Sequence, residues 1–231
     1  MSRKNTTEML QGSPRTVSEP DVDSRAFDEL RQSYVQDAEA VGSVPPPATA
    51  KGVVQTGMQA LTGNRAQVFI DKLSERLAFE RTGSRLYDAM IVKCEAQADS
   101  IGPISVEQLK QIRDDELSHM HLVADAIQSL GADPTVQTPC ADVAGVQGLG
   151  LVQALTDPRT DIAQSLNTIL VAELADNASW ELLSRLAVTL GKDDMARTFD
   201  AAYAKEQEHL MTIQQWLETL TLDLAKVDRG S

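Results

Sequence analysis

The stretch Glu206-Gln207-Glu208-His209 lies inside a run of about residues 195–224 that contains neither Gly nor Pro. On a helix, Glu206 and His209 are one turn apart and share a face. The rest of that face is apolar, and its members are Phe199, Ala202, Glu206, His209, Ile213, Trp216 and Leu220. A charge in an apolar core is costly unless it is paired or bound to metal. This stripe therefore requires a partner elsewhere in the chain.

A second stretch with the same spacing supplies that partner. It reads Glu116-Leu117-Ser118-His119, and its stripe is Ile112, Glu116, His119, Val123, Ala126 and Leu130. The helical run before each motif carries one Glu in its apolar stripe. These two stripes match position by position, as Leu73, Leu77, Glu80, Tyr87 and as Leu166, Leu170, Glu173, Trp180. The pattern indicates an internal repeat of a two-helix unit.

The repeat predicts an all-α fold, a four-helix bundle of two αα hairpins joined by a long crossover. The first hairpin is expected over 66–98 and 105–131, with Ser105-Val106-Glu107-Gln108 as a capping box. The second hairpin is expected over 160–190 and, after a tight turn at 191–193, up to about residue 225. The connection 132–159 is long for neighbouring antiparallel helices, and its apolar part, 143–155, is compatible with a short helix.

The predicted domain organisation is a bundle, residues 66–225, between two tails. Residues 1–50 are rich in Ser, Thr, Pro, Asp and Glu and are predicted to be a mostly disordered tail with one weak helical patch, 26–40. We interpret this tail as a solubilising segment, with a tether that docks a partner as the alternative. Residues 51–65 are expected to form a short helix, Val53–Leu61, and a linker, and 226–231 a C-terminal tail.

Composition excludes several classes of partner. The chain has 231 residues and a net charge of -13, which argues against nucleic acid or an anionic membrane as the main partner. Cys94 and Cys140 lie far apart and predict neither a disulfide framework nor a zinc or rubredoxin-type site. No apolar run is long enough for a membrane span, and Met1 is not followed by a signal-peptide core. We expect a cytoplasmic protein.

A four-helix bundle would bring six polar side chains to one level. They are Glu80, Glu116, His119, Glu173, Glu206 and His209. Four carboxylates offset the charge of two divalent cations, and oxygen ligands with one imidazole per metal suit iron or manganese. The alternative, that these residues lie on exposed faces, would also expose the large apolar side chains of the same stripes. The third histidine, His121, points elsewhere and is expected on the surface.

The span 66–225 resembles the ferritin-like superfamily, in which bacterioferritins and rubrerythrins carry Glu, Glu-x-x-His, Glu, Glu-x-x-His in this order. The resemblance implies that the six residues are metal ligands, with Glu116 and Glu206 as bridges. It also implies a catalytic role for Tyr87, because bacterioferritins carry a Tyr near the metals. The alternative for Tyr87 is a core aromatic.

The chain departs from these families at several points. Leu117 replaces the haem-ligating Met of bacterioferritins, so no haem is expected. The rubredoxin cysteines of rubrerythrins are absent, so electrons would come from an external donor. Asp176 takes the place of an extra rubrerythrin Glu and is an additional ligand, a partner of a His, or a solvated residue. The long tail and crossover argue against a large storage shell, and a smaller homo-oligomer remains compatible with the sequence.

The resemblance implies an oxidoreductase with two iron ions that oxidises Fe(II) with dioxygen or peroxide, or reduces peroxide. One alternative is a catalase-like enzyme with two manganese ions, and a mixed Mn/Fe pair is also compatible with the ligands. A second alternative is a non-enzymatic metal-binding adaptor. A hydroxylase or desaturase of an organic substrate is not excluded, although no substrate pocket is indicated.

Overall fold

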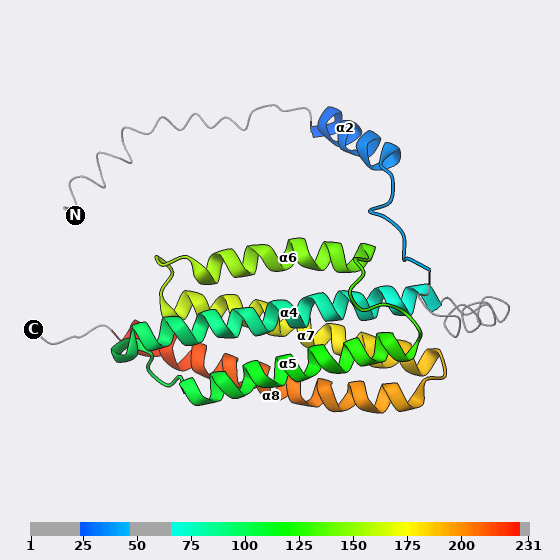
Figure 1. Ribbon diagram of the computed structural model, residues 1–231. Helices are drawn as coiled ribbons and strands as arrows, with labels where there is room; N and C mark the ends of the chain where they lie inside the picture. Colours follow the sequence, from blue (N-terminus) through cyan, green and yellow to red (C-terminus); the bar gives the residue numbers. More distant parts are fainter. Residues whose placement is uncertain (1–23, 47–65, 227–231) are drawn as a thin grey trace, which may run out of the picture. The chain divides into compact units, whose positions relative to one another are not determined.

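The computed structural model describes residues 24–46 and 66–226, and every regular element within these ranges is a helix. The elements are α2 (Ser24–Asp37), α4 (Ala66–Ala96), the short 3-10 helix η1 (Ala98–Ser100), α5 (Val106–Ser129), α6 (Pro139–Thr156), α7 (Ile162–Thr189) and α8 (Asp193–Ala225). Figure 1 shows the five helices α4 to α8 running alongside one another.

Two hairpins form the bundle. Helix α4 packs along α5, α7 packs along α8, and the hairpins meet through α4 with α7 and α5 with α8. Local sequence sets the helix ends. Ser105 caps α5 by accepting a hydrogen bond from the backbone N–H of Gln108, and Asp161 with Gln164 forms a reciprocal capping box on α7. Gly191, with φ of 65°, makes the left-handed turn between α7 and α8. The predicted bundle of two hairpins is confirmed.

The crossover contains a fifth helix that is longer than the sequence suggested. Helix α6 has 18 residues, begins with Pro139 in its first turn and packs on α4 and α7. At the contact with α4, a Cβ on Gly148 would lie 2.9 Å from the Cγ2 atom of Thr82. The missing side chain therefore allows the two helices to approach closely. The crossover is thus a layer of the fold that covers one side of the bundle.

The apolar core is divided into two clusters. One includes Leu86, Ile112, Leu166 and Ile213, and the other includes Leu73, Val123, Trp180 and Phe199. On each of the four bundle helices, the predicted ligand positions lie between residues of one cluster and residues of the other. The polar level is therefore in the middle of the bundle, with apolar packing on both sides.

The N-terminal segment forms a separate unit. The chain divides into Met1–Ala40 and Val41–Ser231. In the first unit, the weak helical patch of the sequence corresponds to α2, which exposes Phe27, Leu30 and Tyr34. The expected short helix Val53–Leu61 and nearly all of the expected C-terminal tail lie outside the described residues. Among the helices that the structure describes, none combines the length and apolarity that a membrane crossing requires.

Candidate metal centre

All six predicted ligands lie at the polar level, and none is more than 7% exposed. Helix α4 contributes Glu80, α5 contributes Glu116 and His119, α7 contributes Glu173, and α8 contributes Glu206 and His209. The one-turn spacing of each Glu-x-x-His places both of its side chains on the inward face of the helix. The structure thus brings together every residue that the sequence singled out as a ligand.

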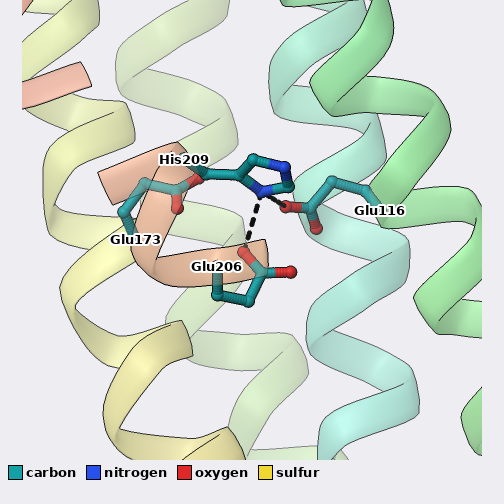
Figure 2. A group of neighbouring side chains, drawn as sticks. All are labelled: Glu116, Glu173, Glu206 and His209. Atoms are coloured by element: carbon teal, nitrogen blue, oxygen red, sulfur yellow. Dashed lines mark hydrogen bonds and ion pairs between the residues drawn. The ribbon is translucent and has the colours of Figure 1, made fainter. Parts of the chain in front are cut away.

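The six side chains form two groups that share one residue. In the first, ligand atoms of Glu116, Glu173, Glu206 and His209 lie within 4.8 Å of one another. Figure 2 shows these four side chains gathered between the helices. In the second, ligand atoms of Glu80, His119 and Glu206 satisfy the same limit. Glu206 belongs to both groups. Two metal positions that share a carboxylate fit this arrangement.

Glu206 lies between the two histidines. Its Oε1 is 2.5 Å from Nδ1 of His119, and its Oε2 is 3.0 Å from Nδ1 of His209. Burial alone would raise the pKa of Glu206, but the hydrogen bonds with the two imidazoles outweigh burial and lower this pKa to about 2. Glu206 is therefore ionised, with one oxygen directed to each imidazole. With a metal ion next to each imidazole, the two oxygens of this carboxylate could each bind one ion.

His209 also has a carboxylate partner on its other nitrogen. Nε2 of His209 lies 3.1 Å from Oδ2 of Asp115, whose side chain is 31% exposed. Burial would lower the pKa of His209, but Glu206 and Asp115 outweigh burial and raise this pKa to about 9. A carboxylate on the far nitrogen fixes the orientation of a metal-binding imidazole. Asp115 therefore orients His209.

Glu80 and Glu173 each have one oxygen held by a neighbouring side chain and one oxygen without a hydrogen bond from the described residues, and Oε2 of Glu80 lies 4.0 Å from Nδ1 of His119. The Nε of Arg76 lies 2.9 Å from Oε1 of Glu80, and the Tyr87 hydroxyl donates a 2.5 Å hydrogen bond to Oε1 of Glu173. In both residues Oε2 is buried and has no hydrogen-bond partner within the described part of the chain. A buried unpaired carboxylate oxygen is costly. Each Oε2 is therefore a suitable donor to a cation.

Two of the crowded carboxylates, Glu173 and Glu116, favour their protonated forms in the absence of a cation. Burial and the charge of Glu206 raise the pKa of Glu173 to about 8. Burial, followed by the charges of Glu206 and Glu80, raises the pKa of Glu116 well above its ordinary value. A divalent cation would replace these protons. The charge, the burial and the donor atoms of the cluster thus all fit a pair of divalent metals.

Tyr87 and His121 differ sharply in their surroundings. Tyr87 is 1% exposed and bonded to Glu173, which places it in contact with the cluster. Burial and the charge of Glu173 raise the pKa of Tyr87 well above its ordinary value, so the hydroxyl keeps its proton and acts as a donor. His121 is exposed on α5, at an open groove between α5 and α8.

Sequence reasoning missed three residues that touch the ligands. Arg76 and Asp115 contact Glu80 and His209, and Gly83 faces Glu116. Asp176 is only 2% exposed and forms an ion pair with Arg76. The interpretation of Asp176 as a solvated residue is therefore wrong. The sequence did indicate the Arg76–Glu80 contact, because residues four positions apart on a helix are neighbours on its surface.

Gly83 provides space for the Glu116 carboxylate. A Cβ on Gly83 would lie 2.9 Å from the carboxyl carbon of Glu116 and closer still to its Oε2. We expect Gly83→Ala to displace this carboxylate and to weaken metal binding about tenfold. The intrinsic helix preference of Ala, about 1 kcal/mol, would by itself stabilise α4. Isothermal titration of the metal-free variant with Mn(II) measures the effect.

Gly145→Ala is the matched control, because Gly145 is also helical and a Cβ there would meet nothing within 4 Å. This control should bind metal as the parent protein does. Equal affinities of the Gly83→Ala and Gly145→Ala variants would show that Glu116 does not need this space to bind metal.

Comparison with known proteins gives a weak match. The chain is similar to a solved structure described as "ferritin like, diiron-carboxylate proteins from Bacillus anthracis str. Ames", with 20% identity, a TM-score of 0.46, and coverage of 64% of this chain and 94% of that chain. No protein-family model and no curated protein matches the sequence. The resemblance to ferritin-like proteins therefore depends on the bundle and its buried Glu/His cluster, and both are present.

Proposed function

We propose that this protein is an oxidoreductase whose carboxylate and histidine side chains bind two metal ions, namely iron. It oxidises Fe(II) with dioxygen or peroxide, or reduces peroxide. The observation that supports this function best is the position of Glu206, with one oxygen directed to each of two buried histidines. The Oε2 atoms of Glu80 and Glu173, which are buried without a hydrogen bond among the described residues, complete a donor set of the required charge. A structural role alone would not require so many buried, unpaired carboxylate oxygens.

In this proposal the ligands divide into two sets. Glu80 and His119 would hold one ion, Glu173 and His209 would hold the other, and Glu206, which belongs to both groups, would be shared between them. Glu116 groups with Glu173, Glu206 and His209, and the resemblance to bacterioferritins supports it as a second bridge. Two bound iron ions would supply two electrons in one-electron steps, which matches the reduction of one peroxide and two protons to two waters. Tyr87 would hold Glu173 by its hydrogen bond and keep one oxygen available.

The electrons would come from an external donor. Cys94 is buried in an apolar cluster on α4, and Cys140 lies at the start of α6, so the two cysteines of the chain are on separate helices. They do not form the paired thiolates of a rubredoxin-type electron acceptor. We therefore expect reduction of the oxidised centre by a separate small reductant or protein.

The test is an anaerobic Fe(II) titration followed by rapid mixing with dioxygen or hydrogen peroxide. Ferric absorbance should develop faster than in buffer and should saturate at two iron ions per chain. Dioxygen release from peroxide by the Mn(II) form, without turnover by the iron form, would favour the manganese alternative. Bound metal that reacts with neither oxidant would contradict an oxidoreductase function.

His119→Ala and His209→Ala should each remove one ligand and reduce the oxidation rate at least about tenfold, with little loss of helix content. The stopped-flow rate and the circular dichroism spectrum of each variant measure these effects. His121→Ala is the natural control, because His121 is the remaining histidine of the chain and is exposed. Full rates in both ligand variants would show that these histidines are not ligands.

A further inference from the structure

Arg76 is a buried cation in direct contact with the cluster. It is 2% exposed, and its Nε lies 2.9 Å from Oε1 of Glu80. Its Nη2 forms an ion pair with Asp176, and its Nη1 donates a 3.4 Å hydrogen bond to the Asp176 backbone carbonyl. The guanidinium thus links α4 to α7 and lies between a predicted ligand and a carboxylate that the ligand set leaves out.

The internal repeat does not reproduce the Arg76–Asp176 ion pair in its second half. When Glu80 is aligned with Glu173, Ile169 takes the place of Arg76, and Gly83 takes the place of Asp176. The two hairpins are therefore equivalent in their ligands but not in the charges around them. A fixed positive charge touches the Glu80 side of the centre, and an apolar side chain occupies the corresponding place next to Glu173.

A fixed cation has opposite effects on the protein with and without metal. In the metal-free protein it offsets buried carboxylates, whose mutual repulsion opposes folding. When a divalent ion approaches Glu80, the guanidinium repels it and occupies one of the carboxylate oxygens. Asp176 partly cancels this repulsion, because it draws the guanidinium toward α7.

We propose that Arg76 acts as a built-in substitute for part of the metal charge, so that the two metal positions fill in order. The first ion binds, more tightly, at the position formed by Glu173 and His209. The second ion binds at the position formed by Glu80 and His119. This inference rests on the proposed pair of metals but concerns a property that the ligands alone do not determine. It also assigns Asp176 a role, which is to hold Arg76 partly away from Glu80.

The test is anaerobic titration of the metal-free protein with Mn(II), with binding monitored by calorimetry and by electron paramagnetic resonance. The parent protein should bind two ions in steps whose Kd values differ at least about tenfold. His209→Ala should abolish the tighter step, and His119→Ala should abolish the weaker one. Two equivalent steps in the parent protein would overturn the inference but not the proposed function, whereas no binding would overturn both.

Arg76→Met separates a charge effect from a structural one. This variant should have a lower Tm without metal and yet bind the second Mn(II) about tenfold more tightly. A merely structural Arg76 would lose both stability and affinity on replacement, and that result would overturn the inference. Asp176→Asn provides a second measurement if Arg76→Met does not fold without metal. Asp176→Asn should weaken the second step, and an unchanged second step would contradict the inference.

Discussion

Glu206→Gln is expected to abolish tight metal binding at both positions at once. The amide keeps the shape of the side chain but loses the charge, and its NH₂ group cannot act as a metal ligand. Glu206 belongs to both ligand groups, whereas His209 belongs to one. Metal analysis after desalting should therefore find almost no bound iron in Glu206→Gln and about one ion in His209→Ala, because a lost ligand costs at least about tenfold in affinity.

Glu208→Gln is the matched control for this experiment. Glu208 lies on the same helix, is exposed, and pairs with Lys205 at the surface. It should retain two metal ions per chain. If Glu206→Gln also retained two, the shared carboxylate would not bridge the metals, and each histidine would have to belong to an independent site.

The stability of the metal-free bundle is expected to fall as the pH rises above the acidic range. The pKa of Glu173 is raised from 4.5 to about 8, and that of His209 from 6.5 to about 9. A group whose pKa is higher in the folded state stabilises the fold below its unfolded pKa, and this contribution disappears as the pH rises through the folded pKa. These two groups therefore remove stability between pH 4.5 and about 9.

Glu206 has the opposite dependence at the acidic end. Its pKa falls from 4.5 to about 2, so its contribution is present above pH 4.5 and is lost as the pH falls toward about 2. The metal-free protein should consequently be most stable in mildly acidic solution.

Metal should reverse the trend at neutral and higher pH. Binding displaces protons from the cluster, so it strengthens as the pH rises, and it stabilises the folded state alone. The Tm gained from metal should be small at about pH 5.5 and should reach about 5–10 °C near neutral pH at a hundredfold excess over Kd. Thermal unfolding of metal-free and Mn(II)-loaded protein across this range measures both trends.

A variant with both bridging residues replaced, Glu116→Gln with Glu206→Gln, should lose most of the metal effect, because two of the four ligand charges are gone. A Tm that did not respond to metal at any pH in the parent protein would show that the six residues do not form a shared site.

Helical periodicity carried most of the information that the sequence provides about this site. Each ligand lies in an apolar stripe, and a buried charge in such a stripe has few alternatives to a metal or a charged partner. For this reason Glu80, Glu116 and Glu206 could be assigned to one level from the sequence alone. The 18-residue helix α6 was harder to predict, because it is apolar on several faces and contains three glycines.

The residues around the ligands could not be predicted in the same way. The Arg76–Asp176 and Asp115–His209 contacts join positions on different helices, and their geometry depends on the rotation of each helix about its axis. The importance of Gly83 depends on the rotamer of Glu116, a side chain on a neighbouring helix. Single-helix patterns contain none of this information.

The division of the ligands between the two hairpins has a kinetic consequence. His119 belongs to the first hairpin and Glu206 to the second, so the contact between them exists only while the hairpins are closed on each other. Separation of the hairpins would dismantle both proposed metal positions, even if each hairpin stayed helical. We therefore expect the residence time of bound ions to be coupled to the opening rate of the bundle, and metal exchange with a chelator would report on that opening.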